Sequence, residues 1–452
     1  MHLWKVALSI ALGATTWLRA SRDRVALRFM SYCFIHAADL HLDTPFEGVA
    51  EVSGVVAERL RDASLEAFDG LVRLAIDRRA AFVVLAGDLY DGAERGVRAQ
   101  LRFLRGLGVL SVAGIPVFVV HGNHDPVGGW PGVREWPPGV TVFGSEQVGV
   151  VPVTRDAVVL ARVYGISYGH REITENLALR FRREEGPGLH VGLLHCNVGD
   201  DPAHGRYSPC SADDLERAGM DYWALGHVHT RQVLREGRPW VVYPGNTQGR
   251  SPKPSERGAK GACVVHVEGA EVRAVEFVAL DRVRFAAFDV EIAGVADLGA
   301  LRARLAAEVD ALTATGAGHD LLVRCTLRGR GAVHADLRCH GGVDELLRDL
   351  RDETCGGGVW WEGLRDLTRP EIDLEAVRGR GDFAAELLLR AEELMADGAE
   401  LTRFVQTALR KGAPSAVHRH LASSDPLEAK AVIEEALFLA LDLLGEESDS
   451  CT

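Results

Sequence analysis

Short apolar runs alternate with polar segments over the first half of the chain, from residue 33 to about 230. Runs of four or five residues rich in Val, Ile, Leu and aromatic side chains predict buried β-strands: Cys33–Ala37, Phe82–Ala86, Val117–Val120, Val191–Leu194 and Tyr222–Leu225. Between the early runs, apolar residues recur at helical spacing in two sets: Phe68, Val72 and Ile76, then Val97, Leu101 and Leu104. We therefore predict strands and helices layered around one core.

The pattern changes twice in the second half of the chain. Alternation in Ala262–Val267 and Val272–Val278 predicts antiparallel strands. From about residue 282, strand-like and helix-like segments predict a small α/β domain ending near Pro370: Phe285–Ile292, Leu298–Leu312, Leu321–Leu327, Val343–Leu350 and Val359–Leu364. Beyond it we expect only helices, one capped by Asp382 and the last opened by Asp425-Pro426. The predicted domains are residues 30–281, 282–370 and 371–452.

The first 29 residues stand apart from this pattern. Lys5 precedes the apolar run Val6–Leu12, which resembles a weak signal peptide ending at Ala20-Ser21. The run is too short to span a bilayer. The alternative, which we favour, is that translation begins at Met30, directly before the first predicted strand.

Composition restricts the function classes. Hydrophobic residues make up 47% and charged residues 25%, which excludes a disordered, collagenous or multi-span membrane chain. The net charge of −13 would repel nucleic acid unless basic groups gather in one place. Eight scattered cysteines without a C-x-x-C pair indicate reduced thiols and a cytoplasmic protein.

Polar side chains follow each of the five apolar runs: Asp39-Leu40-His41, Gly87-Asp88, Gly122-Asn123-His124-Asp125, His195 and Gly226-His227-Val228-His229. Because sites in layered α/β folds form where loops leave the carboxyl ends of strands, these clusters can converge. Taken singly, each is more often a hydrogen-bonded structural residue. Together they supply carboxylates, an amide oxygen and imidazoles without thiolate, a donor set that suits manganese, iron or zinc. Two ions sharing a carboxylate would suit in-line displacement at phosphorus.

The order D-x-H, G-D, G-N-H-D, H, G-H-x-H resembles the calcineurin-like metallophosphoesterases. The segments His36–Asp43 and Pro244–Arg250 resemble more closely the SbcD-like DNA-repair nucleases, including their YhaO-like branch. The resemblance covers roughly residues 31–280, and the C-terminal third matches only in general layout. It implies an α+β fold: a four-layer αββα sandwich with a C-terminal α/β cap domain and a helical tail. Chains of this family begin shortly before the first strand, which supports Met30 as the start.

The resemblance also implies a role for each polar residue, with two divalent metal ions as cofactors and Mn²⁺ expected. Asp39, His41 and His229 would hold the first ion. Asn123, His195 and His227 would hold the second, and Asp88 would bridge the two. His124 would face the phosphate, stabilising charge or protonating the leaving oxygen, with Asp125 orienting its ring.

One loop gathers the basic residues that a DNA substrate requires: Arg250, Lys253, Arg257 and Lys260, against the single acid Glu256. One interpretation is an ordinary solvated loop. The other is a loop that grips phosphate beside the metals and contacts DNA.

The resemblance implies a manganese-dependent phosphodiesterase acting on DNA ends, a 3′→5′ exonuclease with some endonuclease activity. Its expected partners are DNA and an SbcC-like or YhaN-like coiled-coil ATPase, with a homodimer possible and no membrane. One rival is a phosphoesterase for a small phosphodiester such as a cyclic nucleotide. A phosphoprotein phosphatase is disfavoured because Gly87–Gly92 lacks the Arg usual there. The other rival is a non-catalytic scaffold.

The last helix carries an apolar stripe and many acids. The stripe comprises Val432, Leu437, Leu439, Ala440, Leu443 and Leu444. Acidic helices repel phosphates and an apolar stripe needs a protein surface, so we expect this helix to bind a protein partner. The alternative is that the stripe packs on the chain's own cap domain.

Overall fold

The computed structural model describes residues 30–42, 54–91, 96–129, 135–199, 207–315, 318–339, 341–354, 357–412 and 426–449. The signal-like segment before Met30 lies outside the described residues. The chain forms two compact units, the first comprising Met1–Val290, Gly299–Leu327 and His340–Leu367, and the second Glu291–Leu298, Arg328–Cys339 and Thr368–Thr452. The predicted 282–370 segment is thus divided between the two units.

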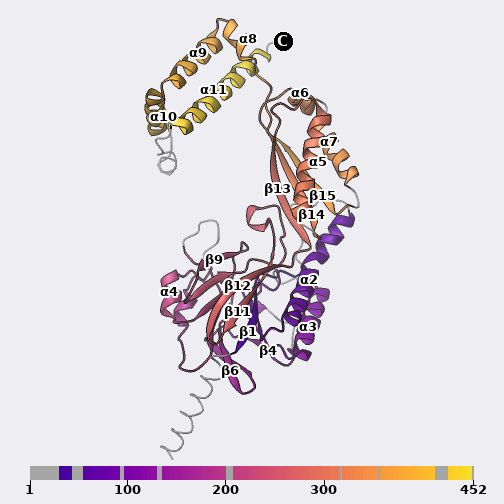
Figure 1. The fold of residues 1–452 in the computed structure, drawn as a ribbon, viewed down its shortest axis with the longest axis vertical. Helices are drawn as coiled ribbons and strands as arrows, with labels where there is room; N and C mark the ends of the chain where they lie inside the picture. Colours follow the sequence, from indigo (N-terminus) through magenta and orange to yellow (C-terminus); the bar gives the residue numbers. More distant parts are fainter. Residues whose placement is uncertain are drawn as a thin grey trace, which may run out of the picture. The chain divides into compact units, whose positions relative to one another are not determined.

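The first unit is built on two six-stranded sheets with the orders β12-β11-β1-β2-β3-β4 and β5-β6-β7-β8-β10-β9 (Figure 1). The strands of the first sheet are β1 (Ser31–Ala37), β2 (Val83–Ala86), β3 (Val117–Val120), β4 (Val140–Val142), β11 (Gly261–Glu268) and β12 (Glu271–Ala279). Those of the second are β5 (Gly149–Arg155), β6 (Val158–Gly165), β7 (Leu189–His195), β8 (Tyr222–Gly226), β9 (Gln232–Arg235) and β10 (Trp240–Tyr243). Strands β1 to β4 are parallel, as are β6, β7, β8 and β10, so in each sheet their carboxyl ends meet at one edge.

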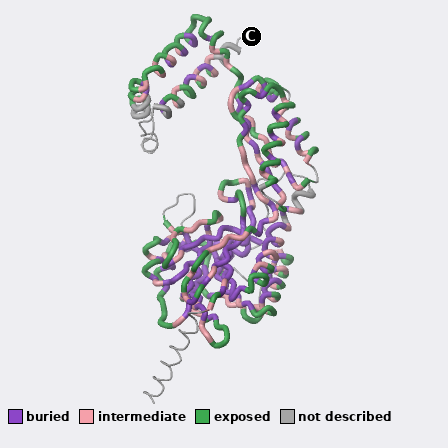
Figure 2. The backbone as a smooth tube through the Cα atoms, in the orientation of Figure 1, coloured by how far each residue is buried: buried purple, intermediate pink, exposed green. Residues whose placement is uncertain are grey.

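Alternate side chains of each strand enter two different cores. Phe34 packs between the sheets with Phe82 and Tyr222, whereas the next residue, Ile35, faces the outer helices with Phe68. Those helices are α2 (Gly54–Asp77) and α3 (Val97–Val112). The outer face of the second sheet is covered by α4 (Ala212–Arg217) and the short helix η2 (Leu177–Arg180). The layers are therefore αββα, as predicted, and buried residues concentrate in the two sheets (Figure 2).

A third, three-stranded sheet follows, in the order β13-β14-β15. Its strands are β13 (Val283–Glu291), β14 (Asp320–Arg328) and β15 (Val359–Asp366), with helices α5 (Leu298–Thr315), α6 (Val333–Arg338) and α7 (Gly342–Glu353). All were predicted within a few residues except the short α6. Val283, Phe285 and Leu322 share a core with Leu60 and Ala63 of α2. This shared core explains why much of the segment belongs to the first unit.

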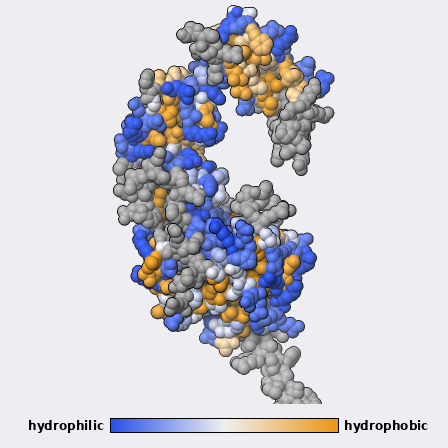
Figure 3. Space-filling model, turned by 180° about the vertical axis from the view of Figure 1, so that it is seen from behind, coloured by the Kyte–Doolittle hydropathy of each residue, from blue (hydrophilic) through white to orange (hydrophobic). Residues whose placement is uncertain are grey.

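The C-terminal part is helical, as predicted: α8 (Leu374–Gly379), α9 (Phe383–Ala396), α10 (Gly398–Gly412) and α11 (Pro426–Asp449). The Asp382 side chain caps α9 by accepting a hydrogen bond from the backbone N–H of Ala385 at 3.1 Å. The apolar stripe of α11 is divided: Leu437 is buried against α9, whereas Leu443 is 58% exposed. Figure 3 shows apolar residues at the surface of this helical region. Within the described residues, no helix combines the length and the apolarity that crossing a bilayer requires.

Candidate metal centre

The polar residues that follow β1, β2, β3, β7 and β8 meet where the carboxyl ends of the two sheets come together. Two contacts join the sheets directly at this point. The Nδ1 of His195, at the end of β7, donates to the carbonyl oxygen of Ala86 at the end of β2, at 2.9 Å. The backbone N–H of His227, after β8, donates to both carboxylate oxygens of Asp39 at 3.1 Å. The predicted convergence of strand ends is therefore present in the structure.

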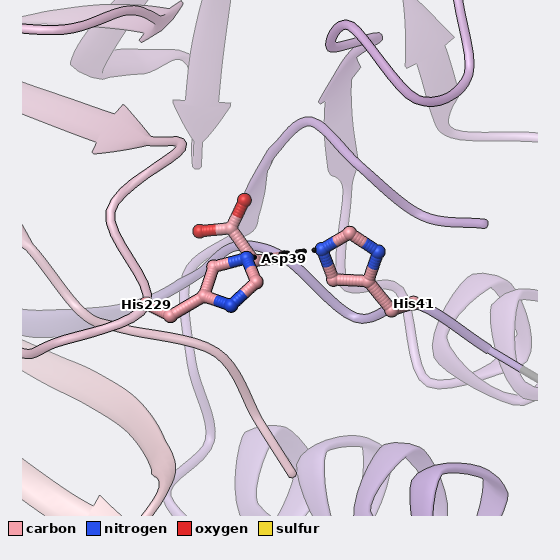
Figure 4. Close-up of side chains that lie close together, drawn as sticks. All are labelled: Asp39, His41 and His229. Carbon is pink, nitrogen blue, oxygen red and sulfur yellow. Dashed lines mark hydrogen bonds between the residues drawn. The ribbon is translucent and has the colours of Figure 1, made fainter. Parts of the chain in front are cut away.

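One group of donors comprises Asp39, His41 and His229, whose ligand atoms lie within 4.8 Å of one another (Figure 4). The Nε2 atoms of His41 and His229 face each other at 3.2 Å. Two such nitrogens can share a single proton, or both lone pairs can point at a common cation. The Nδ1 of His41 is buried and has no hydrogen-bond partner within the described part of the chain, so the described protein groups leave this nitrogen unsatisfied.

A second group lies around His195. Since the carbonyl of Ala86 can only accept, Nδ1 of His195 carries a hydrogen and Nε2 is left to face the site. This Nε2 lies 2.9 Å from Oδ1 of Asn123 and 3.3 Å from Oδ2 of Asp88, both of them acceptors. Three lone-pair donors pointing at one another need a proton or a cation between them. The ring of His227 lies edge-on to that of His195, with centroids 5.3 Å apart.

Asp88 connects the two groups. Its Oδ2 lies 3.3 Å from Nε2 of His195 and 3.9 Å from Nε2 of His41. Asp39, Asp88 and His195 also form a set of donors within 4.8 Å of one another. A Cβ at Gly122 would overlap the Asp88 carboxylate and the His195 ring, so only glycine fits before Asn123. The arrangement offers two adjacent donor sets with one carboxylate between them, which would suit two divalent ions that share this carboxylate.

The buried carboxylates and imidazoles of the site shift one another's pKa. Burial raises the pKa of Asp39. Burial also disfavours the ionised form of Asp88, but His195 outweighs it and holds the pKa of Asp88 well below its usual range. Conversely, burial opposes a charged His195, yet Asp88 and Asp39 raise its pKa to about 9. A divalent cation would replace the His195 proton in neutralising these buried carboxylates, so the residues present fit a metal.

His124 lies at the edge of the centre, and the expectation that Asp125 orients its ring is wrong. Its Nδ1 is hydrogen-bonded to Oδ1 of Asp91, not to Asp125. The other oxygen of Asp91 accepts from Nη1 of Arg250 at 2.8 Å, which gives a chain Arg250–Asp91–His124. Burial disfavours the charged imidazole, but Asp91 and Asp88 together raise the pKa of His124.

Asp125 instead stabilises the loop that follows β3 and carries Asn123 and His124. Its carboxylate is fully buried and accepts from the backbone N–H groups of Gly122 at 2.8 Å and Leu89 at 2.9 Å. It also lies 3.2 Å from Nδ1 of His121. Asp125 therefore fixes the backbone that carries Asn123 and His124 and leaves the His124 ring to Asp91.

The four cations predicted to contact DNA differ in their exposure to solvent and in their partners. Lys253 and Arg257 are exposed. Arg250 is only 17% exposed and pairs with Asp91. Lys260 is buried, which lowers its pKa, and its Nζ donates to the backbone oxygen of His229 at 2.7 Å, so it does not reach solvent as a DNA contact would.

Sequence reasoning missed two acids beside the centre. Asp91 stands three residues after Asp88, in the segment Gly87–Gly92. Glu256 is the single acid among the cations of its loop, and its Oε1 lies 2.5 Å from Nδ1 of His229. A lone carboxylate within a basic cluster is the one signal that could have identified Glu256.

Comparison with known proteins gives the family. Residues 34–231 match the calcineurin-like phosphoesterase family, and residues 285–369 match the family described as metallophosphoesterase YhaO, middle domain. The chain is 36% identical to the uncharacterized metallophosphoesterase YhaO of Bacillus subtilis over 344 residues, which cover 75% of this chain and 83% of that protein. It is 28% identical to the DNA double-strand break repair protein Mre11 of Haloferax volcanii over 365 residues, which cover 76% of this chain and 73% of that protein. The Mre11 of Aeropyrum pernix is 28% identical over 241 residues, 47% of this chain and 52% of that protein.

Two separate segments of the chain match metallophosphoesterase families, and the alignment with YhaO of Bacillus subtilis covers most of that protein. These matches agree with the convergent donor set and the αββα layers. The chain belongs to the calcineurin-like metallophosphoesterases, in the branch that carries the YhaO middle domain.

Proposed function

We propose that this chain is a manganese-dependent phosphodiesterase that cleaves DNA, a 3′→5′ exonuclease with some endonuclease activity that works in the cytoplasm. The observation that carries the proposal is the convergence of oxygen and imidazole donors from five strand ends. Family membership already gives phosphoester hydrolysis. The DNA substrate is supported by relatives whose names describe double-strand break repair.

In this proposal Asp39, His41 and His229 hold one divalent ion. Asn123, His195 and His227 hold the other, and Asp88 lies between them. Two such ions supply Lewis acidity at phosphorus and make water a nucleophile at neutral pH. The protein's own contribution is a rigid, largely buried set of donors, which fixes where a phosphate must sit.

His124 faces the phosphate in this proposal. Because Asp91 holds Nδ1, only Nε2 of the ring is available to the substrate. The raised pKa favours the protonated form of the ring, which can stabilise the charge on phosphorus or donate a proton to the leaving 3′ oxygen. Lys253 and Arg257, exposed on the loop after β10, are the proposed contacts to the DNA backbone.

The proposed partner is an SbcC-like or YhaN-like coiled-coil ATPase, docked on the helices after residue 370, with a homodimer as the proposed oligomeric state. Exposed Leu439, Leu443 and Phe404 on α10 and α11 support a protein-binding surface there. A chain ending at about residue 370 should hydrolyse a small phosphodiester at the wild-type rate but fail to co-purify with that ATPase. If the shortened chain still binds the ATPase normally, the docking surface lies elsewhere.

One experiment tests the catalytic proposal against its rivals. Purified protein is incubated with Mn²⁺ and, separately, a labelled DNA duplex, a cyclic nucleotide and an aryl phosphodiester. We expect duplex degradation that chelation by EDTA abolishes. Cleavage of the cyclic nucleotide without DNA degradation would replace our proposal by a small-phosphodiester enzyme. Metal binding without cleavage of any substrate would make the centre a scaffold.

A further inference from the structure

The loop between β10 and β11 is folded around a buried carboxylate. Glu256 lies in the short helix η3 (Pro254–Glu256), and its side chain is only 6% exposed although its neighbours Lys253 and Arg257 are exposed. Its Oε1 lies 2.5 Å from Nδ1 of His229. Burying a carboxylate is costly unless it is hydrogen-bonded, and His229 supplies one of its hydrogen bonds.

The other oxygen of the Glu256 carboxylate is also occupied. Oε2 accepts from Nδ2 of Asn246 at 2.7 Å and from the backbone N–H of Arg250 at 3.1 Å. Gly245 adopts φ +79°, and a Cβ there would lie 2.8 Å from the backbone oxygen of His229, so this approach requires glycine. Both oxygens thus have fixed partners, and the loop holds the carboxylate in one orientation.

We propose that Glu256 is a positioning residue that selects the metal-binding tautomer of His229. The proposal rests on the assignment of His229 as a metal ligand. A carboxylate can only accept hydrogen bonds, so Nδ1 of His229 must carry the hydrogen. Nε2 then keeps its lone pair, and this is the atom that faces Nε2 of His41 at 3.2 Å. Glu256 never touches the substrate, and acts through the ring that it orients.

The isosteric substitution Glu256→Gln gives a sharp test. The carbonyl oxygen of a glutamine would remain with the two donors, Asn246 Nδ2 and Arg250 N. Its NH₂ group would then point at Nδ1 of His229, which would have to accept. The hydrogen would move to Nε2 and block the lone pair that the metal needs. A glutamate that merely held the loop together would instead be replaced well by glutamine and poorly by alanine.

We therefore expect E256Q to weaken one of two Mn²⁺ sites by about 10- to 100-fold, and E256A to weaken it no more than E256Q does. Isothermal titration with Mn²⁺ measures both sites, and ¹⁵N shifts of labelled histidine report the tautomer in the metal-free protein. The matched control is E276Q, because Glu276 accepts from Nε2 of His266 at 2.9 Å on the exposed strand β12. This control should bind Mn²⁺ like the wild type.

The inference would be overturned if E256Q bound both ions with wild-type affinity, or if E256A lost more affinity than E256Q. Adding E256Q to H229A should change Mn²⁺ binding no further, since Glu256 acts only through His229, and a further loss would also refute it. If E256Q does not fold, the Mn²⁺ affinity of E256A and the tautomer of His229 in the wild type test the inference instead. An Nε2–H tautomer of His229 would contradict it. Fewer than two ions bound to the wild type would count against the proposed function, while the tautomer would still test Glu256.

Discussion

Replacing Asp91 with asparagine separates the orientation of His124 from metal binding. The substitution Asp91→Asn would keep the shape of the side chain but remove the charge that Asp91 shares between Nδ1 of His124 and Nη1 of Arg250. A hydrogen bond to a charged group contributes roughly 1.5–3 kcal/mol. With about 1.4 kcal/mol per factor of ten, kcat should fall roughly 10- to 150-fold. KM and the number of bound Mn²⁺ ions should stay unchanged.

The same substitution should change the pH dependence of kcat. Asp91 helps to raise the pKa of His124, so its removal lowers that pKa. The protonated ring is then lost at a lower pH, and the alkaline limb of the kcat profile should move towards acid. The assay is hydrolysis of an aryl phosphodiester at saturating Mn²⁺ across the pH range. Asp69→Asn is the matched control, because Asp69 pairs with Arg102 on the outer helices.

The reasoning would be refuted if D91N kept the wild-type kcat and alkaline limb while Asp125→Asn altered both. That result would return the orienting role to Asp125. The structure argues otherwise, because the buried Asp125 carboxylate is already held by Gly122 and Leu89. We expect D125N to act mainly on folding stability, measured as a lower Tm.

Three further predictions concern the metal centre. Asp88→Ala should abolish cleavage and weaken both Mn²⁺ sites in a titration; retention of two tight sites would exclude a bridging role. His124→Ala should abolish cleavage while two Mn²⁺ ions stay bound, and a lost ion would make His124 a ligand. Because the pKa of metal-free His195 is about 9, binding must displace its proton, so Mn²⁺ affinity should fall about tenfold for each pH unit below 9. A titration showing the same affinity at pH 6 and pH 8 would contradict this exchange.

The parallel strands β1, β2, β3, β7 and β8 and the donors at their ends could be predicted because two simple patterns coincide, whereas the parallel strands β4, β6 and β10 were missed. Buried parallel strands are continuous apolar runs, and their carboxyl ends share one edge of a sheet. Asp39, Asp88 and Asn123 come two or three residues after such runs, so their neighbourhood follows from the strand order. Half-exposed strands such as β5 and β9 escaped prediction because their burial is weak and irregular.

The helical spacing of apolar residues does not by itself identify the buried face of α3. Val97 and Leu101 have the right spacing, yet they are 71% and 58% exposed. The residues that face the sheet are Ala99, Phe103 and Leu107, with the same period but a different phase. Where several phases of a helix carry apolar residues, only the packing partner decides between them. Asp91 and Glu256 were missed for a related reason, since their partners lie 33 and 27 residues away in the chain.

The backbone conformation that orients the metal-ligating side chains is the feature of the site that the sequence predicts least. Asp39, His41, Asp88 and His227 have φ values of 52°, 41°, 50° and 103°, in a region that non-glycine residues avoid. Each costs roughly 1–3 kcal/mol, and such strain persists only when the surroundings impose it. Here the strand ends impose it, because Asp39 N–H donates to Gly87 O and His41 N–H to Asp88 O, each at 3.0 Å. The two sheet cores that fix these strand ends therefore also offset the strain, so the donors are held in place by the fold itself.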